Sequence, residues 1–170
     1  MAISGLVITY NEEKNIGKCI DALFEVCDEV IIVDSLSADN TVKIAEEKGA
    51  KVISQKFLGD GPQRTHGLPF CKNDWILNLD ADEFLDKDAK EFILKGKYLE
   101  GNYDAFSFRV KNFLADELID FSGWYPDHKV RFFNKKTAKP SEAKVHQKIE
   151  TTNEKKVAVH ILHYGWESFE

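Results

Sequence analysis

Short apolar runs of strand length alternate with helical patterns through the first half of the sequence, and this alternation most constrains the fold. The run from Val30 to Val33 is continuous and β-branched, which is typical of a strand buried on both faces of a parallel sheet. Similar runs cover residues 3–9, 51–55 and 75–79. Because strands that alternate with helices form right-handed βαβ units, we predict an α/β fold with a mostly parallel sheet flanked by helices.

Helices are predicted in the segments between these strands. Asn11 is placed to cap a helix whose apolar face recurs at helical spacing through residues 16–27. The other predicted helices cover residues 41–48, capped by Asp39 or Asn40 and ended by Gly49, and residues 88–94, with Asp88 and Glu91 at capping-box spacing.

The second half of the chain has a different character, which predicts a more mixed α+β structure there. Residues 56–74 are rich in glycine and proline and are predicted to be irregular. No linker separates the two halves, so we predict a single domain over residues 1–170. Strands are predicted at residues 103–113, 129–134, 144–150 and 157–164.

Composition narrows the classes of function. The chain has 29 acidic and 23 basic residues and a net charge of −6, which argues against a general nucleic-acid binder but allows a local basic groove. Its three cysteines form no CxxC pair, and Cys19 falls on the apolar face of a predicted helix, which indicates a buried thiol and a reducing compartment. We see neither a membrane span nor a signal peptide, and expect a cytoplasmic protein that can still meet a substrate at the membrane surface.

Polar side chains follow three of the predicted strands at the points where these strands end. They lie in residues 9–12, 34–39 and 80–83. Because ligands bind at the carboxyl ends of the strands in open α/β sheets, these segments are expected to form one site.

Asp80 and Asp82 are the most informative pair in these segments. In an extended backbone, residues two apart point to the same side, so both carboxylates can reach one hard divalent cation, Mg²⁺ or Mn²⁺. The alternative is that they cap the next helix or face solvent. Asp34 and Ser35 suit hydrogen bonds to a base or ribose, with an ordinary capping loop as the alternative.

Residues 9–13, 33–41 and 75–83 together resemble the family 2 glycosyltransferases with the GT-A (Rossmann-like) fold. The resemblance extends to the branch that includes the lipopolysaccharide core-biosynthesis glucosyltransferases. The order and the spacing of all three segments match, and the resemblance is strongest over residues 3–85. It implies a nucleotide-sugar donor, usually UDP-linked, a divalent metal and inversion at the anomeric carbon.

The resemblance also implies roles for individual residues. Residues 1–100 would form the nucleotide-sugar half, and residues 101–170 would complete the acceptor and metal sites. Asp82 would be the principal metal ligand, with Asp80 nearer the ribose and the metal waters, and His163 is a candidate for a further ligand. The residues implied at the nucleotide are Thr9, Tyr10, Asn11, Glu12, Asp34, Ser35, Arg64 and Asp80.

In the second half, residues 123–133 and the pairs Val145-His146 and His163-Tyr164 also fit the family. Gln147 departs from it, because an acid often follows the histidine that corresponds to His146. Relatives usually continue into helices beyond His163, so we expect that acceptor-binding or membrane-facing parts lie outside this sequence.

An inverting transfer needs a base opposite the leaving diphosphate, and the second half of the chain should supply it. Asp127 is our prediction, because it follows Trp124, Tyr125 and Pro126, where the two aromatic rings could stack on an acceptor sugar. Glu142 is the alternative base. The expected partners are a UDP-sugar and a glycan or glycolipid acceptor.

Two other functions use similar residues. Nucleotidyltransferases also hold Mg²⁺ with paired carboxylates, but they usually carry a glycine-rich basic loop after the first strand, where this chain has Tyr10-Asn11-Glu12-Glu13. A non-catalytic nucleotide-sugar-binding module is the second alternative.

Overall fold

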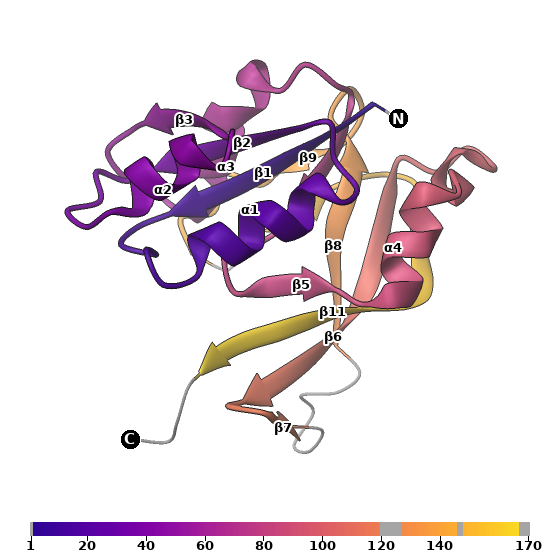
Figure 1. Cartoon of the computed structure of the whole chain (residues 1–170). Coiled ribbons are helices and arrows are strands. Elements are labelled where there is room, and N and C mark those ends of the chain that lie inside the picture. Colours follow the sequence, from indigo (N-terminus) through magenta and orange to yellow (C-terminus); the bar gives the residue numbers. More distant parts are fainter. Residues whose placement is uncertain (1, 120–126, 146–147, 167–170) are drawn as a thin grey trace.

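The computed structural model describes residues 2–119, 127–145 and 148–166. Within these residues one nine-stranded sheet runs through the molecule in the order β3-β2-β1-β4-β8-β6-β11-β5, with β7 paired to β6 (Figure 1). A two-stranded sheet of β9 and β10 lies apart from it. The structure therefore has the α/β class that the sequence predicts.

The first four strands in the sheet order are parallel and form the predicted first half. The predicted strands are confirmed to within one residue at each end. Their bounds are β1 (Ile3–Thr9), β2 (Glu29–Asp34), β3 (Lys51–Ser54) and β4 (Trp75–Asn78). These four strands pair in parallel with one another. Parallel strands are joined by crossover helices that cover both faces of the sheet, and this explains why the strands are apolar on both faces.

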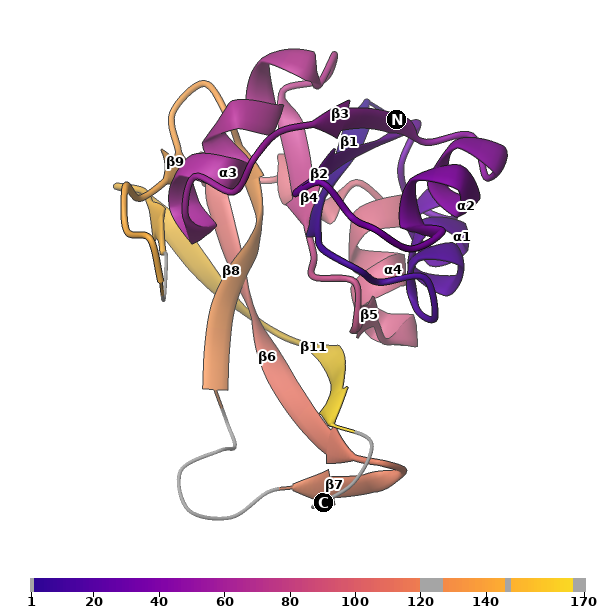
Figure 2. The same ribbon diagram turned by 90° about the vertical axis from the view of Figure 1, so that its left-hand side faces the viewer.

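Helices cover both faces of this sheet, as Figure 2 shows. On one face lie α1 (Ile16–Phe24), α2 (Thr41–Glu47) and α4 (Lys87–Leu94), and on the other lies α3 (Asp60–Gly67). Short 3₁₀ turns follow α3 and α4 at Leu68–Phe70 and Lys97–Leu99. Three of the four helices were predicted.

Two of the predicted caps are wrong. Asn11 does not cap α1, which begins at Ile16; its side chain instead accepts a hydrogen bond from the amide of Ala38 at 2.8 Å. Asp86, not Asp88, caps α4, where its side chain accepts from the amide of Ala89 at 2.8 Å. No side chain caps the start of α1, whereas at α4 Asp86 takes the role predicted for Asp88.

The segment predicted to be irregular contains α3, which the sequence analysis missed. Two glycines allow this helix to approach its neighbours closely. A Cβ atom at Gly67 would lie 2.6 Å from Val33 Cγ2, and one at Gly61 would lie 1.8 Å from the carbonyl oxygen of Ser141. The glycines that suggest a loop therefore permit a tightly packed helix.

The second half is mixed, as predicted. β8 (Asp127–Asn134) pairs antiparallel with both β4 and β6 (Ala105–Leu114), and β11 (Glu154–Trp166) runs parallel to β6. Of the strand predicted over 144–150, only β10 (Ile149–Glu150) forms, and residues 146–147 lie outside the described part. Three further strands were not predicted from the sequence, namely β5 (Glu83–Leu85), β7 (Glu117–Ile119) and β9 (Lys139–Pro140).

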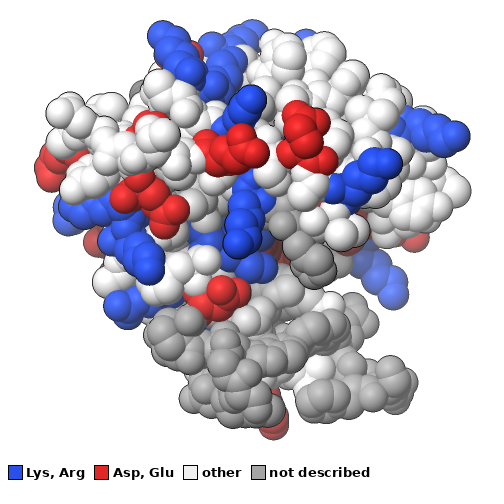
Figure 3. Space-filling model, turned by 180° about the vertical axis from the view of Figure 1, so that it is seen from behind, with Lys and Arg blue, Asp and Glu red and all other residues white. Residues whose placement is uncertain are grey.

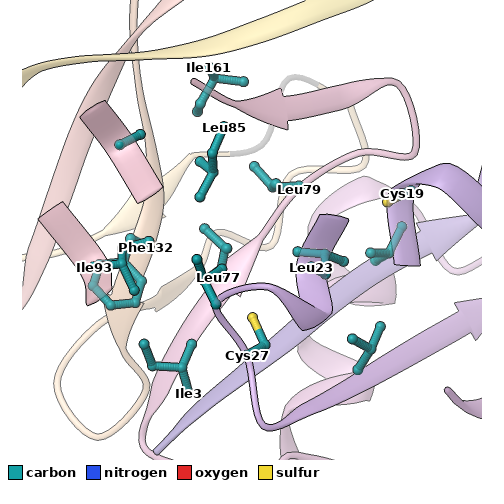
Figure 4. Packing of buried hydrophobic residues seen from close by; sticks show 14 of the residues in the cluster. Ile3, Cys19, Leu23, Cys27, Leu77, Leu79, Leu85, Ile93, Phe132 and Ile161 are labelled. Carbon is teal, nitrogen blue, oxygen red and sulfur yellow. The ribbon is translucent and has the colours of Figure 1, made fainter. Parts of the chain in front are cut away.

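Two apolar clusters fill the two sides of the sheet. The larger packs α1 and α4 against the sheet, and Figure 4 shows Leu77 and Leu79 of the β4 segment among Leu23, Cys27 and Phe132. All three cysteines are buried free thiols. Cys19 is 1% exposed, as predicted, and burial raises its pKa to about 12. In the described part of the chain, no helix is both long and apolar enough to cross a membrane.

Candidate active site

The loops that follow β1, β2 and β4 meet at the carboxyl ends of these strands. The amide of Asn11 donates to Ser37 Oγ at 2.8 Å, and the amide of Glu12 donates to Thr41 Oγ1 at the same distance. A cleft of about 600 Å³ opens at this edge of the sheet. We call it the strand-end cleft. Sites at this position are the rule in open α/β sheets.

Most residues predicted to contact the nucleotide line the strand-end cleft. Those that do are Thr9, Tyr10, Glu12, Ser35, Arg64 and Asp80. Phe57 also lines the cleft. The side chains of Phe57 and Tyr10 are 55% and 61% exposed. Phe57 was not predicted from the sequence, although a large aromatic residue in a polar loop is itself a sign of a binding surface.

Asp34 lies beneath the cleft and not on its wall. Its side chain is 1% exposed and accepts three hydrogen bonds from the protein. Thr9 Oγ1 donates to it at 2.9 Å, and Ser37 donates through its amide at 2.9 Å and its hydroxyl at 2.6 Å. The geometry therefore gives Asp34 the task of holding two of the loops together.

Asn11 performs a similar task between the same loops. Its backbone has φ of 52°, in the left-handed region that asparagine tolerates better than most residues. Its Oδ1 accepts from the amide of Ala38, and its own amide donates to Ser37. Asn11 is not among the residues that line the cleft.

Glu12 is a carboxylate in an already acidic part of the cleft. Burial raises its pKa, and the negative charges of Asp82, Asp80 and Asp39 raise it further, against the lowering effect of the hydrogen bond from Asn15. The loops therefore collect negative charge on one wall of the cleft, which favours a cationic or metal-bound group there.

Asp80 is held by two arginines. Arg64, which is 3% exposed, donates to Asp80 Oδ1 and to Asn78 Oδ1, both at 2.7 Å. Burial alone would raise the pKa of Asp80, but the charges of Arg64 and Arg131 outweigh it and hold the pKa well below its usual range. Asp80 is therefore an ionised carboxylate engaged in ion pairs on the α3 side of the sheet.

A buried ion pair that the sequence analysis missed supports this arrangement. Arg131 of β8 donates to both carboxylate oxygens of Glu83, at 3.0 and 3.1 Å, and the two residues are 6% and 2% exposed. Glu83 also accepts from the amide of Asp80 at 2.9 Å. The available signal was an arginine within the apolar run of residues 130–133, which a buried strand tolerates only with a partner.

The backbone between Asp80 and Asp82 is not extended. The amide of Glu83 donates to the carbonyl of Asp80 at 3.0 Å, which closes a turn. The two-residue alternation on which the paired-carboxylate argument rests is therefore wrong here, because it holds only in extended strands. Asp80 turns toward the arginines, and Asp82 turns toward β11.

Asp82 meets His163, the histidine that the family resemblance suggested as a metal ligand. His163 Nε2 lies 3.2 Å from Asp82 Oδ2, and its Nδ1 lies 2.8 Å from Asn112 Oδ1. Burial lowers the pKa of His163, but the hydrogen bond and charge of Asp82 outweigh this effect and raise it.

The donor set at Asp82 and His163 fits a divalent cation. Carboxylate and imidazole are both common ligands, and Asn112 orients the ring through its other nitrogen. Gly165 keeps the space beside them open, since a Cβ there would lie 2.6 Å from His163 Nε2 and 3.2 Å from Asp82 Oδ2. Among the described residues, no group of three or more His, Cys, Asp or Glu side chains could hold a metal.

A second cleft of about 470 Å³ adjoins the first. Asp127, the predicted base, lines it together with Ser107 and Lys129. We call it the β8 cleft. The other predicted base, Glu142, is exposed and lines neither cleft. Trp124, Tyr125 and His146 lie outside the described residues.

A parallel sheet with a polar cleft at its strand ends, continued by a mixed half that adds a second cleft, defines the GT-A fold of nucleotide-sugar-dependent glycosyltransferases. The comparison with known sequences agrees with this class. The chain belongs to glycosyl transferase family 2, whose sequence profile matches residues 4–155.

Individual proteins that are similar to this chain are also named as glycosyltransferases. An uncharacterized glycosyltransferase of Rickettsia felis is 48% identical over 91 residues, which cover 54% of this chain and 32% of that protein. The lipopolysaccharide core biosynthesis glycosyltransferase LpsC of Rhizobium meliloti is 36% identical over 98 residues, which cover 55% of this chain and 36% of LpsC. The chain thus spans about a third of the length of these relatives.

Solved structures confirm the fold. S. aureus TarS 1–349 superposes over 96% of this chain and 60% of its own, with a TM-score of 0.68 at 18% identity. The same protein in complex with UDP-GlcNAc is 28% identical over 66% of this chain and 35% of its own, with a TM-score of 0.56.

Proposed function

We propose that the chain transfers a sugar from a UDP-linked donor to an acceptor hydroxyl by an inverting, metal-assisted displacement. The observation that carries this proposal is the wall shared by the two clefts. Asp60, Arg64 and Asp80 line both the strand-end cleft and the β8 cleft. A donor in the first cleft and an acceptor in the second would meet at this wall, as direct transfer between two bound substrates requires.

The nucleotide would occupy the strand-end cleft. Tyr10 and Phe57 offer exposed rings for the base, and Thr9 and Ser35 offer hydroxyls for the ribose. Asp34 acts indirectly, since it holds Thr9 and Ser37 in place. The complex of TarS with UDP-GlcNAc, a related structure, supports a uridine diphosphate donor.

Asp82 and His163 would hold Mg²⁺ or Mn²⁺. A cation there would neutralise the charge that develops on the departing diphosphate, so that side of the reaction needs no acid. Asp80 stays with Arg64 and Arg131 in this scheme. Its role is to position the turn that carries Asp82 and to face the ribose side of the donor.

Asp127 would remove the proton from the acceptor hydroxyl. It lines the β8 cleft, on the far side of the shared wall from the nucleotide loops. A carboxylate is a much weaker base than an alkoxide, so it takes the proton only as the new C–O bond forms. Position matters more than strength for such a base, and of our two candidates Asp127 alone lines the cleft.

The acceptor would be a glycan or glycolipid. The name of the R. meliloti relative, a lipopolysaccharide core biosynthesis glycosyltransferase, supports a role in lipopolysaccharide or other cell-surface glycan synthesis. We expect the protein to act in the cytoplasm, at the inner face of the membrane where such acceptors are built. The acidic loop after β1 disfavours the nucleotidyltransferase alternative, because Glu12 lies where a phosphate-binding loop would need basic or glycine residues.

The test is UDP binding by calorimetry with Mn²⁺ and with EDTA, followed by UDP release from UDP-glucose, UDP-galactose and UDP-GlcNAc. We expect metal-enhanced UDP binding and slow release of UDP from at least one donor, with water as acceptor. UDP binding with no release from any donor would favour the binding module. Absence of UDP binding under both conditions would contradict the proposal.

A further inference from the structure

Three buried polar atoms on one face of the β6–β8 pair have no partner among the described residues. They are the hydroxyl oxygen of Ser107, Nε of Arg109 and Nδ1 of His128. Ser107 is 1% exposed. Buried polar groups are almost always satisfied, so each exception calls for an explanation. Three exceptions side by side point to a ligand that supplies the missing partners.

The strand register places these atoms together. Arg109 pairs directly with His128, and Ser107 pairs with Val130, in the antiparallel ladder of β6 and β8. Directly opposed residues share a face of the sheet, and so do residues two apart. Ser107, Arg109 and His128 therefore project from the same face as neighbours.

This face borders the β8 cleft. Ser107 and His128 both line it, and α3 closes it through Asp60 and Arg64. Ala105, two residues before Ser107, packs with Cys71 and Ile149 on the α3 side of the sheet. Figure 3 views the molecule from the side that carries α3, where basic and acidic side chains are interspersed.

Positive charge remains unpaired around these atoms. Arg64 forms ion pairs with Asp60 and Asp80, and Arg131 forms one with Glu83. Within the described residues, no ion pair engages Arg109, nor the cleft residues Lys129 and Lys148. Two acids without an ion pair among the described residues also line the cleft and balance its two lysines, so Arg109, on the same face of the sheet, adds one further positive charge.

Asp127 and Glu154 are those acids. Asp127 is the proposed base, so it must stay free to meet the acceptor hydroxyl. Neither acid forms an ion pair with Arg109. A buried guanidinium Nε–H is satisfied best by an anionic oxygen, because such charge-assisted hydrogen bonds are about twice as strong as neutral ones.

We infer that the acceptor carries an anionic group, a phosphate or a carboxylate, which binds to Ser107, Arg109 and His128. This inference rests on the proposed function, since it assigns the β8 cleft to the acceptor. The anion fixes the acceptor so that its reactive hydroxyl reaches Asp127. Acceptors without the anion leave three buried groups unpaired and are rejected.

The test uses the whole chain, saturated with UDP and Mg²⁺ so that the strand-end cleft cannot take the added anion. Inorganic phosphate and glucuronate are titrated separately while the arginine Nε–H signals are followed by NMR, and sodium chloride at equal ionic strength is the control. We expect the Arg109 signal to shift saturably with phosphate, with glucuronate or with both. The anion that binds more tightly identifies the acceptor group.

Variants complete the test. Because Arg109→Gln removes the reporter signal, anion binding to the variants is measured by calorimetry. Arg109→Gln should weaken anion binding about 10- to 100-fold, as loss of a charged hydrogen bond does, and leave UDP affinity unchanged. Lys43→Gln removes one positive charge from α2, on the other face of the sheet. It should change neither anion binding nor UDP affinity. If Arg109→Gln fails to fold, Ser107→Ala serves instead and should weaken the anion about 3- to 10-fold.

The outcomes separate the two proposals. UDP binding without an anion-dependent shift at Arg109, or anion binding that survives the variants, overturns this inference alone. Failure of UDP itself to bind contradicts the proposed function.

Discussion

Asp82 is the residue on which the metal assignment depends. Its carboxylate lies 3.2 Å from His163 Nε2, while Asp80 is occupied by Arg64. Asp82→Ala should therefore abolish the gain in UDP affinity that Mn²⁺ gives, measured by calorimetry with Mn²⁺ and with EDTA. Asp88→Ala, an exposed acid on α4, is the matched control and should keep the gain. Equal metal enhancement in Asp82→Ala would remove Asp82 from the ligand set.

Gly165 offers a second way to test the same site without removing a ligand. Its Cα leaves open the space beside His163 Nε2 and Asp82 Oδ2. Gly165→Ala should therefore weaken Mn²⁺-dependent UDP binding while leaving UDP binding in EDTA close to that of the parent. A variant that keeps the full metal effect would mean that the cation binds elsewhere.

Substitution of the two candidate bases, Asp127 and Glu142, should have different effects on UDP release. Asp127→Asn keeps the size of the side chain and removes its basicity, so UDP binding should persist while UDP release falls by about 10²–10⁴-fold. Glu142 is exposed and lines neither cleft. The Glu142→Gln variant should therefore release UDP at the parent rate. The reverse pattern would make Glu142 the base.

At the scale of elements, α3 separates what the sequence could predict from what it could not. The parallel strands were predictable because each is apolar on both faces. The helix α3 was not, since the residues it buries include Gly61, Gln63, Arg64 and Gly67, and no apolar stripe marks it. Its place is set by close approach and by ion pairs with distant residues.

The candidate site divides in the same way. The loops after β1, β2 and β4 were predictable because strand order alone brings them to one edge. The partners of Asp80 and Glu83 were not, because Arg131 lies 48 positions from Glu83 on an antiparallel strand. The turn at residues 80–83 is closed by hydrogen bonds between Asp80 and Glu83, the same residue that Arg131 holds. Hence the separation of Asp80 from Asp82 could not be read from their spacing.

Gly61 shows how closely α3 must approach its neighbours. A Cβ there would lie 1.8 Å from the backbone oxygen of Ser141, which no side-chain rotation can relieve. Gly61→Ala should destabilise the chain by about 1–3 kcal/mol, the usual cost of overpacking. Gly17→Ala in α1 meets only contacts of 3.5 Å or more, so it should stabilise by about 0.4–1 kcal/mol. Thermal unfolding measures both, and equal effects would contradict this account of α3.

For the whole molecule, the Glu83–Arg131 pair connects the parallel half to the mixed half. Glu83 begins β5, directly after the turn that follows β4, and Arg131 belongs to β8, which pairs with both β4 and β6. The buried network continues through Asp80 to Arg64 on α3. Since one sheet and one network run through both halves, we expect a single domain in which the halves unfold together.

Removing one partner of this pair should cost more than removing both. Arg131→Met leaves the carboxylate of Glu83, 2% exposed, without its partner, which typically costs about 3–5 kcal/mol. In the double variant with Glu83→Gln no buried charge is left uncompensated, so its loss of stability should be smaller than that of Arg131→Met alone. Urea unfolding followed by both tryptophan fluorescence and far-ultraviolet circular dichroism should give coincident transitions in every variant. Non-coincident transitions would contradict the single domain. If the double variant lost as much stability as the two single variants, Arg131→Met and Glu83→Gln, lose together, the two charges would not stabilise each other.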